Sequence, residues 1–133
     1  MSQLSSYFQQ NQFCVLMEYL TSLTEVFPTK TVFAGYPTVM TLADRVHSDH
    51  DISPLEASEN YSNSVEKVIH FSGKGRDIKD FELFLKQAKT AHIKNLLLLT
   101  GDKLKEHEDG KNGALRSRYL ESVNAVMAAK KQG

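Results

Sequence analysis

Four short apolar runs recur along the chain at nearly equal intervals, and this spacing constrains the fold more than any other feature of the sequence. The runs are Phe13–Tyr19, Val39–Val46, Val68–Phe71 and Leu96–Leu99, and they start 26, 29 and 28 residues apart. Each interval leaves room for one crossover helix and two loops, as in successive strand–helix–strand units. The last two runs are typical of strands buried on both faces. The spacing therefore predicts an α/β fold with a parallel sheet.

Two helices are predicted between the runs from apolar spacing and capping residues. One carries a single apolar stripe in steps of three, four and three positions, made of Ile78, Phe81, Leu85 and Ala88. Asp77 precedes this stripe and can cap the first turn. The other helix begins at residues 53–56, Ser-Pro-Leu-Glu, where serine, proline and glutamate stand as in a capping box.

The other two intervals give a late helix and a weak one. The last helix is expected from about Arg118 to Lys130, with Lys130 suited to its negative C-terminal end. Its predicted apolar face consists of Tyr119, Leu120, Val123, Val126 and Met127. Residues 21–37 hold two prolines, a glycine and several β-branched residues, which favours only a partial helix there.

Composition and charge narrow the class of protein. No shift in composition divides residues 1–133, so a single domain is expected. Basic and acidic residues balance at 16 each, so no large positive field attracts nucleic acid or an anionic membrane. The longest apolar run is too short to span a bilayer, and the N-terminus lacks the plan of a signal peptide. With one cysteine, Cys14, and hence no internal disulfide, these features predict a soluble cytoplasmic protein.

Polar residues gather where the predicted strands end, which is where parallel α/β folds carry their functional groups. In chain order these residues are Glu18, Asp44, the segment 47–51 (His-Ser-Asp-His-Asp), His70, the segment 72–77 (Ser-Gly-Lys-Gly-Arg-Asp), and Thr100-Gly101-Asp102. The coincidence of each polar cluster with a strand end supports a functional edge of the sheet.

Two carboxylates in these clusters have a functional and a structural interpretation. Glu18 lies in an apolar run, where desolvation would raise the carboxyl pKa and suit a general acid, but alternation along the strand would turn it to water. Asp102 follows Gly101, which lets a ligand approach the backbone, but an aspartate in a turn also caps local N–H groups. The sequence pattern leaves both pairs of alternatives open.

Metal and phosphate sites are weaker hypotheses. His47 and His50 stand near acidic residues, but apart from His70 no second pair has a recognisable ligand spacing, so we predict no metal site. Segment 72–76 resembles a phosphate-binding turn with two cations, Lys74 and Arg76, but it has neither the P-loop nor the dinucleotide-binding spacing.

The order of these segments resembles the N-terminal half of the methylenetetrahydrofolate reductase family. Glu18 in VLMEY fits a first strand ending in glutamate, and DRVHSDHDISPLEAS resembles the aspartate, polar loop and S-P-L helix start that follow the second strand. His70 in KVIHFSGKGRD fits the histidine of the third strand, and KNLLLLTGD, the most specific segment, fits N-x-L-x-L-x-G-D. Tyr119 in RYLESV fits a tyrosine near the fourth helix. The resemblance covers residues 13–127 and implies four βα units of a TIM (β/α)₈-type barrel, a half-barrel with parallel strands.

The resemblance also implies an activity and a set of site residues. The implied protein is a flavin-dependent oxidoreductase of one-carbon metabolism and methionine biosynthesis. In that family FAD takes hydride from NAD(P)H and passes it to 5,10-methylenetetrahydrofolate, giving 5-methyltetrahydrofolate. The implied catalytic residues are Glu18, as the acid that helps to open the methylene bridge, and Asp102, which tunes the flavin and the folate. The implied FAD-binding residues are Asp49, His70, Thr100, Gly101, Asp102, Tyr119 and Leu120.

Departures from the family pattern keep other functions open. Many members have arginine where Thr100 precedes Gly-Asp, and the first run lacks the family's two prolines after the glutamate. Four units are half of a barrel, so the expected partner is a second copy or a separate chain that completes it. The alternatives are a non-catalytic flavin- or folate-binding half of a split enzyme, and a metal-dependent barrel hydrolase built on His47, His50 and His70.

Overall fold

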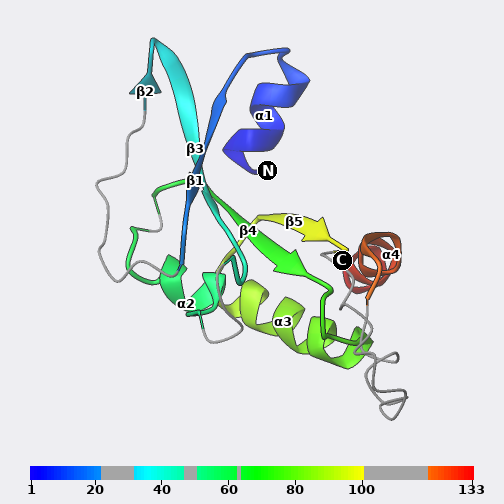
Figure 1. Ribbon diagram of the computed structural model, residues 1–133. Helices are drawn as coiled ribbons and strands as arrows, with labels where there is room; N and C mark the ends of the chain where they lie inside the picture. Colours follow the sequence, from blue (N-terminus) through cyan, green and yellow to red (C-terminus); the bar gives the residue numbers. More distant parts are fainter. Residues whose placement is uncertain (22–31, 47–50, 63, 101–119) are drawn as a thin grey trace.

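The computed structural model describes residues 1–21, 32–46, 51–62, 64–100 and 120–133 (Figure 1). Its main sheet contains β1 (Val15–Tyr19), β3 (Tyr36–Leu42), β4 (Lys67–Ser72) and β5 (Asn95–Leu99), in the order β1-β3-β4-β5. Every neighbouring pair along this path is parallel. The prediction of a parallel sheet built on the four apolar runs is therefore confirmed.

The strand register is staggered from one side of the sheet to the other. Glu18 is aligned with Thr41, Thr41 with Val68, and Val68 with Asn95. This row begins near the carboxyl end of β1 and finishes at the first residue of β5. Side chains in one row lie on one face of the sheet, so Glu18 and Asn95 share a face.

In the described part of the chain, helices follow three of the strands, and two of these helices begin as the capping residues predict. In α2 (Pro54–Ser58), the hydroxyl of Ser53 accepts a hydrogen bond from the N–H of Glu56. In α3 (Ile78–Thr90), Asp77 and Asp80 form a reciprocal capping box. Each cap satisfies N–H groups that the first turn of a helix leaves without a partner.

The hydrophobic core lies between one face of the sheet and the helices α3 and α4 (Ser122–Gln132). Phe71 of β4 packs against Phe81 and Phe84 of α3, with ring centroids 4.8 Å away in both cases. The rest of the buried cluster is Met40, Leu42, Ile69, Leu85, Ala88, Leu120 and Ala125. Because α3 and α4 share this cluster, both helices lie on the same side of the sheet.

The predicted apolar face of the last helix is wrong. The helix begins at Ser122, so Leu120 reaches the core from the preceding segment, while Val123 is 66% exposed and Met127 is 56% exposed. The face turned to the core is made of alanines, led by Ala125. Small side chains let a helix approach its neighbours closely, and a pattern that counts only large apolar residues misses such a face.

Residues 32–37, at the end of the range 21–37 in which a partial helix was predicted, form a hairpin. β2 (Val32–Phe33) pairs antiparallel with Tyr36 and Pro37 at the start of β3. Both turn residues, Ala34 and Gly35, have positive φ, 51° and 83°, as a tight two-residue hairpin requires. The rest of the predicted partial helix falls at residues 22–31, outside the described residues.

The N-terminal helix α1 (Gln3–Gln9) lies on the side of the sheet opposite α2 and α3 (Figure 1). The backbone N–H of Leu4 donates to Glu66 Oε1, and the side-chain amide of Asn95 donates to the same oxygen at 2.8 Å. One carboxylate therefore holds α1 at the amino-terminal ends of β4 and β5. Among the described residues, no helix combines the length and the apolar character needed to cross a membrane.

Candidate functional site

The sheet face turned away from α3, called the open face below, is the side on which α1 lies, and it carries alternate residues of each strand. These residues are Leu16 and Glu18 of β1, Val39 and Thr41 of β3, Val68 and His70 of β4, and Leu97 and Leu99 of β5. The residues on the central strands β3 and β4 are buried, whereas those on β1 and the leucines of β5 are exposed. The open face thus has a buried middle and two exposed flanks.

Glu18 and His70 meet on the open face from strands that are not neighbours. The Glu18 Oε1 lies 3.9 Å from His70 Nδ1, across the intervening strand β3. Their environments differ sharply, since the Glu18 side chain is 58% exposed and that of His70 is 8% exposed. The two residues that the sequence placed on different strands are therefore brought together, with the carboxylate toward solvent and the imidazole inside.

The second ring nitrogen of His70 is a buried polar atom in need of a partner. No group among the described residues forms a hydrogen bond with His70 Nε2. Burial lowers the pKa of His70 below its usual value, although the carboxylates of Glu18 and Asp44 act in the opposite direction. A neutral imidazole can donate or accept at Nε2, so this atom is suited to hold a polar group of a ligand.

Stability is expected to fall on acidification because of His70. The folded protein binds a proton here less readily than the unfolded chain, so this contribution is complete above about pH 6.5 and is lost as pH falls toward the lower folded pKa. Urea denaturation of the chain and of His70→Gln between pH 8 and pH 5 measures the effect. The variant should show a flatter dependence on pH, and identical slopes would contradict this assignment.

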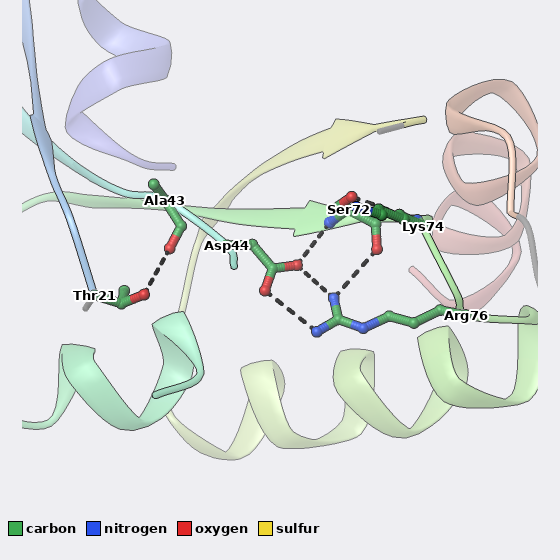
Figure 2. A network of polar contacts seen from close by, with 6 residues as sticks. All are labelled: Thr21, Ala43, Asp44, Ser72, Lys74 and Arg76. Atoms are coloured by element: carbon green, nitrogen blue, oxygen red, sulfur yellow. Dashed lines mark hydrogen bonds and ion pairs between the residues drawn. The ribbon is translucent and has the colours of Figure 1, made fainter. Parts of the chain in front are cut away.

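A polar network joins the carboxyl ends of β3 and β4 (Figure 2). The carboxylate of Asp44, whose side chain is 1% exposed, accepts hydrogen bonds from both terminal nitrogens of Arg76 and from the backbone N–H of Ser72. Arg76 also donates to the Ser72 carbonyl at 3.2 Å and lies over the ring of Phe71. The guanidinium is thus occupied on several sides, which removes one of the two cations from the predicted phosphate-binding turn.

Sequence reasoning noted Asp44 and Arg76 separately and missed their partnership. They stand 32 positions apart, and no local pattern connects them. The predicted strand order could have revealed this pair, because the residues that follow neighbouring parallel strands meet at the same edge of a sheet. A buried carboxylate after one strand and an arginine after the next are a natural pair there.

Two predicted cofactor-binding residues have structural contacts. The hydroxyl of Thr100 accepts a hydrogen bond from the backbone N–H of Ser122 at 3.1 Å and donates one to the Ser122 hydroxyl. Thr100 therefore caps the first turn of α4. The side chain of Glu121, at the N-cap itself, makes no capping bond. Leu120 is buried, and its N–H donates to the carbonyl of Gly73 at 3.1 Å. Both residues therefore hold α4 against the carboxyl ends of β4 and β5.

The remaining predicted site residues lie outside the described residues. These are Asp49, Gly101, Asp102 and Tyr119, together with His47 and His50 of the metal alternative. Within the described residues, no group of three histidine, cysteine, aspartate or glutamate side chains is placed to hold a metal ion. The described site therefore consists of Glu18 and His70, braced by the Asp44–Arg76 network.

Comparisons with models of protein families, with curated proteins and with solved structures found no match to this chain.

Proposed function

We propose that this chain is the first half of a (β/α)₈-type barrel that binds FAD and reduces a methylene-bridged folate with NAD(P)H. Three features support the half-barrel. The strands follow one another in sequence order, the helices α3 and α4 share one core, and the register is staggered as barrel closure requires. A doubly wound sheet would instead reverse its strand order at a switch point.

The observation that carries the proposed activity is the Glu18–His70 pair. A solvent-facing carboxylate and a buried imidazole lie 3.9 Å apart on the open face. In a barrel this face is the interior, and its carboxyl-terminal end is where substrates bind. The pair thus combines a group able to transfer a proton with a buried group that can hold both that carboxylate and a ligand.

One atom of the site supports the proposal that a flavin binds here. The unpartnered Nε2 of His70 offers one hydrogen bond to a ring carbonyl or a ring N–H of a bound cofactor. FAD would supply the hydride chemistry that protein side chains lack. The occupied guanidinium of Arg76 is not free to bind the FAD phosphates, which leaves Lys74 as the cation of that turn.

Glu18 would act as the proton donor to the substrate. Opening a methylene bridge between two nitrogens requires a proton on the nitrogen that leaves. The carboxyl group of Glu18, which lies 3.9 Å from His70 Nδ1, would deliver that proton. His70 restricts the positions of Glu18 through their contact, while the Asp44–Arg76 network fixes the strand end from which His70 projects.

Flavin binding is the first test of this function. Titration of FAD with the purified chain, followed by flavin fluorescence, should show saturable binding. His70→Asn should weaken that binding about tenfold through the loss of a buried hydrogen bond. His92→Asn is the matched control, because His92 is exposed and its positive φ of 55° suits asparagine. Absence of binding, or equal weakening by both substitutions, would refute the flavin proposal.

A further inference from the structure

A cleft lies between α2 and α3, on the side of the sheet opposite the open face (Figure 1). Its volume is about 170 Å³, and every residue that lines it belongs to the described part of the chain. The lining residues are Ser53, Pro54, Leu55, Phe71, Arg76, Asp80, Leu83, Phe84 and Gln87. An apolar cavity of about 150 Å³ accommodates one benzene molecule, so this cleft has room for a single six-membered ring.

The face of α3 that lines the cleft is apolar in the middle and polar at both ends. It consists of the residues at positions 80, 83, 84 and 87, a spacing that places them along one side of a helix. In the middle, Phe84 is buried and Leu83 is 58% exposed. The ring of the buried residue Phe71 is the contribution of the sheet. A flat apolar group in the cleft would therefore contact both the helix and the sheet.

Arg76 brings hydrogen-bond donors to the cleft. Its bonds to Asp44 and to the Ser72 carbonyl use both N–H groups of Nη1 and one of Nη2 (Figure 2). An arginine side chain has five N–H groups, so the Nε–H and one N–H of Nη2 have no acceptor among the described residues. The guanidinium also lies over the Phe71 ring, with its Cζ 4.7 Å from the ring centroid. An aromatic ligand beside these two groups would extend the stacking that they already form.

Asp80 supplies a complementary acceptor. Its Oδ2 accepts the N–H of Asp77 in the capping box of α3, whereas its Oδ1 accepts no hydrogen bond from the described residues. The charge of Arg76 is already balanced by Asp44, so the carboxylate of Asp80 gives the cleft a negative charge. Such a lining disfavours phosphates and carboxylates and favours an uncharged ligand.

We propose that this cleft binds a small, uncharged heteroaromatic ring that carries both a carbonyl group and an N–H group, as pyrimidine bases do. The carbonyl oxygen would accept a hydrogen bond from Arg76, and the ring N–H would donate one to Asp80. The faces of the ring would contact the apolar side chains of Phe71 and Leu83. The site does not rest on the proposed flavin chemistry, because it lies on the opposite side of the sheet from the open face.

A titration of the full chain with uracil tests the proposal. The NMR shifts of backbone amides should saturate with a dissociation constant of about 1 mM, and the largest shifts should fall on the lining residues of α3. Dihydrouracil keeps the carbonyl and N–H groups but lacks the aromatic ring, so it should bind about fivefold more weakly. Orotate, which adds a carboxylate to the uracil ring, should also bind more weakly because of the charge of Asp80.

Two alanine variants on α3 provide the matched comparison. Leu83→Ala removes part of the apolar wall and should weaken uracil binding about fivefold, while the exposure of Leu83 keeps the cost to the fold small. Ile78→Ala is the control, because Ile78 is also exposed on α3, at 40%, but does not line the cleft. Shifts that do not saturate, or equal binding of uracil and dihydrouracil, would overturn the proposal. Tighter binding of orotate, or equal weakening by the two variants, would overturn it as well.

Discussion

Replacing Gly73 with alanine is expected to destabilise the chain by about 3 to 5 kcal/mol, the upper range for a single substitution. A Cβ atom at this position would lie 1.8 Å from the carbonyl oxygen of Leu120 and 2.7 Å from its carbonyl carbon. Both are backbone atoms, so no side-chain rotation relieves the overlap. Gly73 also donates to the Leu99 carbonyl at 2.8 Å and accepts from the N–H of Leu120, which holds three segments together.

Gly75 provides the matched control for this prediction. Its φ is +68°, but a Cβ added there would meet nothing within 4 Å. Gly75→Ala should therefore cost only about 1 kcal/mol, from backbone conformation alone. Urea denaturation of both variants measures the difference. Equal effects would show that close packing of Leu120 on Gly73 is not what holds α4 in place.

Replacing Asp44 with alanine is expected to cost about 3 to 5 kcal/mol of unfolding free energy, as for other buried ion pairs that lose one partner. The Arg76 side chain, which is 14% exposed and lies over the ring of Phe71, would lose the Asp44 carboxylate that accepts its hydrogen bonds. The N–H of Ser72 would lose its acceptor as well. Thermal or urea denaturation measures this loss.

The double variant Asp44→Met with Arg76→Met is the informative companion. It removes both charges and keeps much of the volume, so it should recover a large part of the stability that Asp44→Ala loses. If the double variant is as unstable as Asp44→Ala, the hydrogen bond to Ser72 outweighs the ion pair. If Asp44→Ala itself lowers the unfolding free energy by less than about 1 kcal/mol, the Asp44–Arg76 network does not stabilise this end of the sheet.

The sequence predicted the sheet and α3 well, because their signals are strong and local. Apolar runs at even intervals have few alternatives to parallel strands joined by crossovers, and the stripe predicted for α3 follows its capping residue directly. Three of its four members, Phe81, Leu85 and Ala88, are buried, whereas Ile78 is 40% exposed. The face of α4 could not be predicted in the same way. The side of α4 that faces the core consists of alanines, which are only weakly hydrophobic. A pattern based on hydrophobicity therefore selects Val123 and Met127, which are exposed.

The candidate site was predictable in its members and not in its contacts. Glu18 and His70 were chosen from their places in the strands, but their approach across β3 depends on the register, which the sequence does not specify. The Asp44–Arg76 pair depends in the same way on strand order. The hairpin at residues 32–37 was not predicted because a two-residue strand is too short to show a periodic pattern.

The order of the strands has a consequence for biosynthesis. Each strand of the main sheet pairs with the one released from the ribosome just before it, with no strand left waiting for a distant partner. The nascent chain can therefore add one unit at a time, each new strand covering the edge that its predecessor exposed. The exposed edge advances with translation, so a ribosome that pauses between units always presents a parallel strand edge to the surrounding chaperones.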